Sequence, residues 1–168
     1  MLLDVSMLFE PLEVRGKTLR NRVVMPPMVV NRDLTRSDGV RWYTCRAEGG
    51  VALVIVESTA VNRFGADLTT ESLRPLVQSV HDAGGLIAIQ LFPVTRGRSI
   101  TAAEVGPDER ESIIENYRRA TEICRDTGFD GVEPHGAHGY LLNQFFSPVQ
   151  NTRTDPYGGA LENRMQMA

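Results

Sequence analysis

Short apolar runs alternate with segments of helical spacing along most of the chain, and this alternation restricts the fold more than any other feature. Val51–Val56 is apolar at every position, which is typical of a strand covered on both faces in a parallel sheet. The runs predicted as strands are Val23–Met25, Val51–Val56, Leu86–Ile89 and Gly131–Glu133. Their order, with helical segments between them, predicts a parallel sheet with helices packed against it.

Three segments between these runs have the periodicity of helices. Asp38–Glu48 is followed by two glycines, as is common at the end of a helix. Leu73–Val80 has an apolar stripe, and we expect Ser72 to cap this helix so that Pro75 falls in its first turn. Pro107–Gly128 begins with a proline and ends with a glycine, which predicts a long third helix.

The length of the chain limits which parallel fold is complete. A closed (β/α)8 barrel needs ~250 residues and rarely fewer than ~200, whereas this chain has 168. No linker or internal repeat is visible, so we expect residues 1–168 to form a single domain. Periodicity alone does not separate an open, doubly wound sheet from part of a closed barrel.

Charge and hydropathy exclude several classes of protein. The net charge is −3 and no block of Lys or Arg is present, which disfavours binding to nucleic acid or to an anionic membrane surface. The longest apolar run is too short to span a bilayer, and no secretory signal pattern begins the sequence. We therefore expect a cytoplasmic protein that acts on small molecules.

Ligands of parallel α/β folds bind at the carboxyl ends of the strands, so the residues that follow each apolar run are the candidates. These residues are Pro27, Met28, Val29, Glu57, Ser58, Gln90, His135 and His138. Two imidazoles three residues apart, followed by Tyr140, are suited to holding a carbonyl or anionic oxygen while a phenol supplies a proton.

The same residues have alternative interpretations. A metal site at His135 and His138 lacks the acidic partner of a His-Glu-x-x-His helix, and the neighbouring glycines disfavour a helix. Either histidine could instead be a structural side chain, and Gln90 a hydrogen-bonded residue at a strand end. The two cysteines, Cys45 and Cys124, have no disulfide or metal spacing and are interpreted as packing residues.

Residues 135–164 (HGAHGYLLNQFFSPVQNTRTDPYGGALENR) resemble the long signature of the old yellow enzyme family of FMN-dependent ene-reductases. Supporting matches are Gly16–Met25, Arg46–Gly50 and Ile89–Phe92. The similarity extends over essentially the whole chain but only over the first half of the family's barrel. It implies a (β/α)8 barrel that carries FMN, is reduced by NADH or NADPH, and transfers hydride to an activated C=C bond.

The resemblance also implies roles for individual residues. Pro27, Met28, Val29 and Ser58 would line the flavin, and Gln90 would bond its pyrimidine edge. His135 and His138 would hold the carbonyl oxygen of the substrate, and Tyr140 would protonate the α-carbon, so these three are the expected catalytic residues. His135 would also contact the cofactor, and no metal is expected.

The chain departs from the family pattern at several positions. Val29 replaces the usual Thr or Cys that hydrogen-bonds the flavin, and Pro93–Arg96 replaces the usual His-x-Gly-Arg. The capping segment between Gly97 and Gly106 and the loop after Phe64 are shorter than is usual in the family, which predicts an open substrate site.

The family's later strands, which carry a basic residue near the flavin and the phosphate-binding loops, have no counterpart here. We therefore expect half of a (β/α)8 barrel, with about four parallel strands and three crossover helices, completed by a second polypeptide in a heterodimer. The first hypothesis is a split FMN-dependent ene-reductase in which this chain polarises the substrate and the partner anchors the FMN phosphate. The alternatives are a redox-inactive barrel subunit, a redox-neutral isomerase or cyclase using the His-His-Tyr site, and a truncated or engineered half-barrel.

Overall fold

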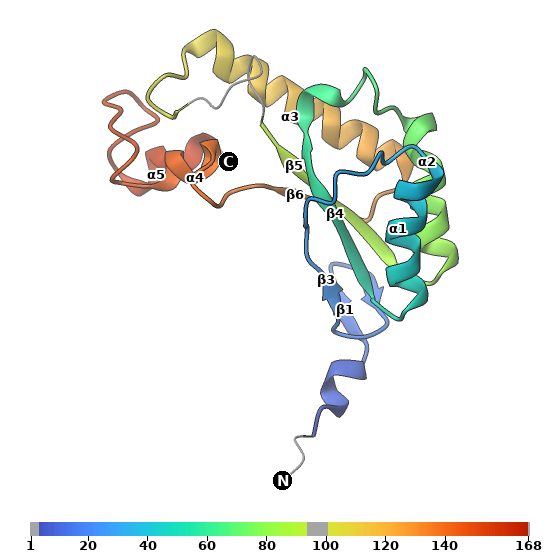
Figure 1. The fold of residues 1–168 in the computed structure, drawn as a ribbon. Coiled ribbons are helices and arrows are strands. Elements are labelled where there is room, and N and C mark those ends of the chain that lie inside the picture. The colour runs from blue at the N-terminus through green and yellow to red at the C-terminus, as the bar shows by residue number, and fades with distance from the viewer. Residues whose placement is uncertain (1–3, 94–100, 168) are drawn as a thin grey trace.

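The computed structural model describes residues 4–93 and 101–167, and a four-stranded parallel sheet lies at its centre (Figure 1). Its strands are neighbours in sequence order: β3 (Val24–Met25), β4 (Leu53–Ala60), β5 (Leu86–Phe92) and β6 (Gly131–Pro134). All four strands predicted from the apolar runs are present, and every pair is parallel. The predictions for Val94–Arg96 lie outside the described residues.

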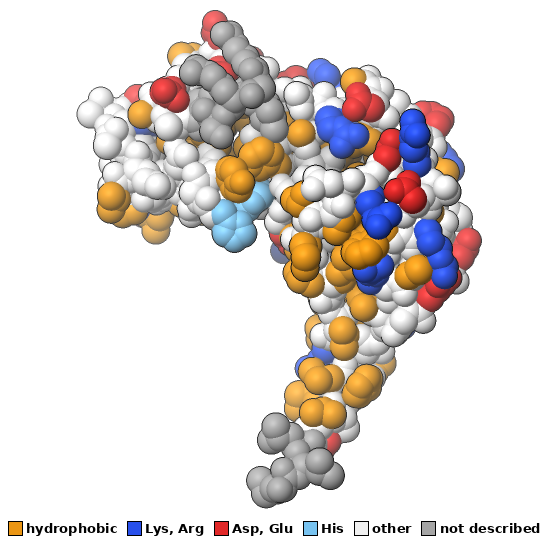
Figure 2. Space-filling model, viewed as in Figure 1, with side chains coloured by type: hydrophobic (Ala, Val, Ile, Leu, Met, Phe, Trp, Pro, Cys, Tyr) orange, Lys and Arg blue, Asp and Glu red, His pale blue; other side chains and the backbone are white. Residues whose placement is uncertain are grey.

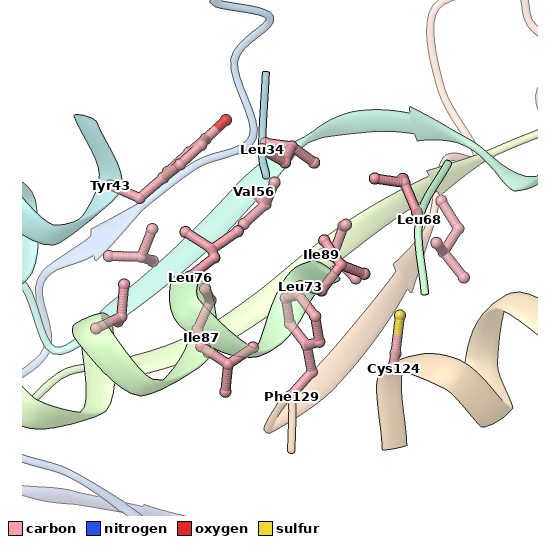
Figure 3. Packing of buried hydrophobic residues seen from close by; sticks show 14 of the residues in the cluster. Leu34, Tyr43, Val56, Leu68, Leu73, Leu76, Ile87, Ile89, Cys124 and Phe129 are labelled. Carbon is pink, nitrogen blue, oxygen red and sulfur yellow. The ribbon is translucent and has the colours of Figure 1, made fainter. Parts of the chain in front are cut away.

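Three helices cover one face of this sheet: α1 (Ser37–Glu48), α2 (Thr70–Asp82) and α3 (Pro107–Thr127). Figure 3 shows the core between these layers, where Leu73 and Leu76 of α2 meet Ile87 and Ile89 of β5. Gly128 ends α3 in the left-handed conformation at φ 102°, as its position after the periodic stripe predicts. The predicted alternation of strands and helices is confirmed.

The opposite face of the sheet differs from the prediction. Val54 and Val56 are fully buried against the helices, but Leu53 and Ile55, which alternate with them on β4, remain partly exposed. On β4, the expectation of a strand covered on both faces therefore holds for one face only, whereas Ala88 and Gln90 on the inner face of β5 are buried. The outer edges of β3 and β6 have no strand partner among the described residues.

The start of α2 also corrects the sequence prediction. Thr69, and not Ser72, is the N-cap, and the two side chains form a reciprocal capping box with each other's backbone N–H. Pro75 consequently lies inside the helix rather than in its first turn. Its missing N–H costs one helical hydrogen bond near the helix start, which the capping box partly offsets.

A small hairpin precedes the sheet and was not predicted. Its strands β1 (Leu12–Val14) and β2 (Lys17–Leu19) are antiparallel and are joined by a turn in which Arg15 and Gly16 both have positive φ. Lys17 reaches the buried carboxylate of Asp130 at 2.9 Å. Burial by itself would raise the pKa of Asp130, but hydrogen bonds from the Ile87 N–H, Lys17 and His81 lower it below its usual range.

The chain continues beyond β6 into a small second layer with its own core. Its helices are α4 (Leu141–Phe146), α5 (Leu161–Arg164) and the 3-10 turn η3 (Met165–Met167), and another 3-10 turn, η1 (Ser6–Phe9), lies near the N-terminus. Leu141, Leu142 and Phe145 pack with Ala102 and Val105. No helix within the described residues is both long and apolar enough to cross a membrane.

Candidate active site at the carboxyl ends of the strands

A pocket of about 590 Å³ lies at the carboxyl ends of the strands and is lined by every predicted site residue except Glu57, which is buried outside it. Its lining residues are Pro26, Pro27, Met28, Val29, Ser58, Gln90, Phe92, His135, Ala137, His138 and Tyr140. They come from four separate parts of the chain, which the parallel sheet brings to one edge. Figure 2 shows histidine side chains on the concave side of the molecule, beside hydrophobic side chains.

The segment after β3 forms an apolar wall of the pocket. Met28 and Val29 are more than half exposed there, and the two prolines before them end the strand because they lack N–H groups. The buried carboxylate of Glu57, within β4, accepts hydrogen bonds from the backbone N–H groups of Val30 and Asn31. Glu57 thus holds the segment in position from the neighbouring strand.

His135 follows β6 and is almost fully buried, with its backbone N–H donating to the Leu91 carbonyl oxygen at 2.9 Å. The Ala137 backbone N–H donates to His135 Nδ1, so the neutral ring carries its proton on Nε2. Burial, and then the neighbouring His138, lower the pKa of His135, while Glu133 opposes this shift. The neutral ring is therefore the favoured form, and it offers one N–H donor.

His138 has a left-handed backbone conformation, with φ 57°, and Gly139 follows it at φ 73°. Asn143 and Gln144 on α4 secure this turn, because the Gly139 N–H donates to Asn143 Oδ1 at 2.9 Å and Gln144 Nε2 donates to the Gly139 carbonyl at 2.7 Å. The His135 and His138 rings are perpendicular, with centroids 5.3 Å apart. The short helix α4, which the sequence analysis missed, thus positions a predicted site residue.

Tyr140 completes this cluster and is 40% exposed. Its ring centroid lies 5.0 Å from that of His135 and 4.7 Å from that of Phe92, with edge-to-face geometry in both pairs. The sequence analysis did not choose Phe92 as a site residue. The signal was available, because Phe92 lies two residues after Gln90 on the same strand and so projects to the same face.

The other titratable candidates lie outside the pocket. His81 binds Asp130 at the opposite, amino-terminal end of the strands. Cys124 is buried, and burial raises the pKa of its thiol to about 12, which fits a packing role. Within residues 4–93 and 101–167, no group of three or more His, Cys, Asp or Glu side chains is arranged to hold a metal ion.

The sequence model of the NADH:flavin oxidoreductase / NADH oxidase family matches residues 7–110 and 96–168. An NADPH dehydrogenase of Geobacillus sp. (strain WCH70) is 36% identical over 191 residues, which include 95% of this chain and 56% of the relative. An NADPH dehydrogenase of Listeria welshimeri is 33% identical over 97% of this chain and 58% of the relative. The chain thus spans about half the length of these curated relatives.

Solved structures share the fold. Old Yellow Enzyme from Pichia sp. AKU4542 superposes with a TM-score of 0.85 and 28% identity, over 96% of this chain and 54% of that one. Morphinone reductase N189A in complex with tetrahydroNAD superposes with a TM-score of 0.82 and 28% identity, over 95% of this chain and 57% of that one. The four-stranded sheet and its helices are therefore half of a TIM barrel, as the sequence predicts.

The alignment with the Geobacillus relative is longer than this chain. It extends over 191 residues although the chain has only 168, so the Geobacillus relative contains residues in the matched region that this chain lacks. The two family matches overlap at residues 96–110, which include the whole segment Gly97–Gly106 that is predicted to be short.

Proposed function

Because this chain belongs to the NADH:flavin oxidoreductase / NADH oxidase family, we propose that it forms the substrate-polarising half of an FMN-dependent ene-reductase. The observation that carries the proposal is the convergence of His135, His138 and Tyr140 on one pocket with Gln90 and the apolar segment after β3. The proposed substrate is an α,β-unsaturated carbonyl compound, and the proposed reductant is NADH or NADPH.

The pocket residues fit an isoalloxazine ring. Pro27, Met28 and Val29 present apolar surface suited to a flat aromatic system, and Ser58 and Gln90 add polar groups beside it. FMN bound there would supply the hydride that reduces the C=C bond. The Val29 side chain cannot hydrogen-bond the ring. The reduction potential of a bound flavin would therefore be set without the side-chain hydrogen bond that is usual at that position.

The two histidines and the tyrosine act on the substrate in this proposal. His135, neutral and carrying its proton on Nε2, donates to the carbonyl oxygen together with His138. Negative charge grows on that oxygen as hydride reaches the β-carbon, so these donors bind the transition state more tightly than the substrate. Tyr140 delivers the proton to the α-carbon.

The FMN phosphate needs residues beyond the described pocket, because no Lys or Arg lines it. The uncovered inner face and the open edges of β3 and β6 favour a second polypeptide that supplies the remaining strands and the phosphate site. This interface would be large and apolar, resembling a core divided between two chains.

Purification of this chain from its native cells by an affinity tag tests the proposal. The purified material is called the assembled protein below. We expect a co-purifying polypeptide and a flavin absorbance band near ~450 nm, which is a property of the cofactor. The chain expressed alone should be aggregated or molten and free of flavin. Soluble, cooperatively folding and monomeric chain would contradict the split assembly, and an assembled protein without flavin would favour redox-neutral chemistry.

A further inference from the structure

Gln90 and Glu133 are neighbours on β5 and β6. They are register partners in the parallel ladder, so their side chains project to the same face of the sheet. The preceding pair, Ile89 and Val132, packs into the core beneath the helices. Gln90 and Glu133 therefore project to the inner face, where Gln90 lines the candidate active site.

The two side chains are joined by a hydrogen bond in which Gln90 Nε2 donates to Glu133 Oε1 at 2.5 Å. A carboxylate only accepts hydrogen bonds, whereas an amide has one donor end and one acceptor end. The carboxylate therefore selects one of the two orientations of the Gln90 amide. In the other orientation, two acceptor oxygens would face each other.

The selected orientation leaves specific groups for a ligand. Gln90 is 9% exposed, and its Oε1 makes no hydrogen bond to the described part of the chain. Glu133 accepts only one of the two hydrogens on Gln90 Nε2, so the other is available to a ligand. No Lys or Arg among the described residues forms an ion pair with Glu133. The Glu133 carboxylate is therefore not occupied by a cation and accepts the hydrogen bond from Gln90.

We propose that Glu133 is a positioning residue that holds the Gln90 amide with its oxygen as acceptor, and its remaining N–H as donor, toward the pocket. This pattern is complementary to an N–H group beside a carbonyl, which is the arrangement at the pyrimidine edge of a flavin. The consequence for the flavin rests on the proposed function, whereas the orientation of the amide does not.

The first measurement needs no flavin. In assembled protein labelled with ¹⁵N-glutamine, the two Gln90 side-chain amide protons are assigned by their loss in Gln90→Ala. We expect the proton bonded to Glu133 to be shifted downfield. This shift should disappear in Glu133→Ala and decrease in Glu133→Gln, whose neutral amide is a weaker acceptor and does not select one orientation of Gln90. Glu122→Gln, an equal change on the exposed side of α3, should keep it. Unchanged Gln90 signals in both Glu133 variants would overturn the proposal.

The second measurement compares FMN with N3-methyl-FMN, which lacks the hydrogen that the Gln90 oxygen would accept. We expect the assembled protein to prefer FMN by about tenfold, the value of one hydrogen bond. This ratio should fall to near one in Glu133→Ala, decrease in Glu133→Gln and persist in Glu122→Gln. If Glu133 had a merely structural role, its replacement would weaken the binding of FMN and of N3-methyl-FMN equally, and that result would overturn the proposal. Absence of binding in the unmodified protein contradicts the proposed function instead, and the amide signals still decide the role of Glu133.

Discussion

The carboxylate of Glu57 accepts a hydrogen bond from the backbone N–H of Asn31 at 3.2 Å and thereby ties β4 to the segment after β3. Asn31 has a positive φ of 54°, an unfavourable conformation that this contact helps to hold. The Tyr43 hydroxyl adds a second link, because it accepts a hydrogen bond from the Glu57 backbone N–H at 3.3 Å. The apolar wall of the pocket thus depends on a buried acid outside it.

Glu57→Ala should destabilise the assembled protein by about 1–3 kcal/mol, because the backbone N–H groups of Val30 and Asn31 lose a charged acceptor. The expected fall in the thermal midpoint is about 3–10 °C, measured by circular dichroism. Glu48→Ala, which removes an exposed acid paired with Arg41, should change the midpoint by less than about 2 °C. An equally small effect of Glu57→Ala would show that Glu57 does not hold the segment after β3 in position.

Asp130→Asn should remove a pH-dependent contribution to stability. The pKa of Asp130 is lower in the folded protein than the ~3.9 of an unfolded Asp, so its contribution is present above about pH 4 and is lost as the pH falls through the folded value. Thermal midpoints of the assembled protein should therefore differ most between the original protein and the variant at neutral pH, and converge in acid. Asp126→Asn, at an exposed position, serves as the control. If the thermal midpoints of the original protein and of Asp130→Asn differed by the same amount at every pH, the proposed contribution of Asp130 would be refuted.

Tyr140→Phe should lower turnover of an enone by about 10²–10⁴-fold, the usual contribution of a general acid. Reduction of the flavin by NADPH should stay nearly unchanged, because the proton is needed only after hydride reaches the substrate. Stopped-flow absorbance separates the two steps. Tyr157→Phe, which removes a hydroxyl outside the pocket, should affect neither, and an equal loss in both steps for Tyr140→Phe would show that its role is misassigned.

Replacing His135 and His138 together by Ala should weaken binding of a phenol or enone ligand by about 10–100-fold, since two hydrogen-bond donors are lost. Titration calorimetry of the assembled protein measures the affinity. His81→Ala, at the other end of the strands, should leave the affinity unchanged. Retained affinity in the double variant would argue against the carbonyl-binding role.

The sequence was sufficient to predict the main sheet, because fully apolar runs and helical stripes are local patterns. It was less successful where neighbouring signals compete. Ser72 and Thr69 are both good capping residues, and their reciprocal bonds decide that the helix starts at Thr70. The helix α4 was not predicted because its six residues make fewer than two turns, too few for a helical period to stand out.

The candidate site was likewise predictable from the sequence only in part. Gln90, His135, His138 and Tyr140 could be chosen from the sequence because residues that follow parallel strands meet at one edge. Glu133 could not be chosen by that rule, although its side chain contacts Gln90. The hydrogen bond between Gln90 and Glu133 joins residues 43 positions apart, and no local pattern encodes it.

By itself, the sequence determined the order of strands and helices, the parallel arrangement and the set of candidate site residues at the strand ends. Only the tertiary structure decided which face of each strand is covered and which buried acids hold the pocket in shape. The physical reason is that periodicity reflects the environment averaged along one element. The contacts of Glu57 and Glu133 instead depend on the register between strands, which is set by packing across the whole sheet.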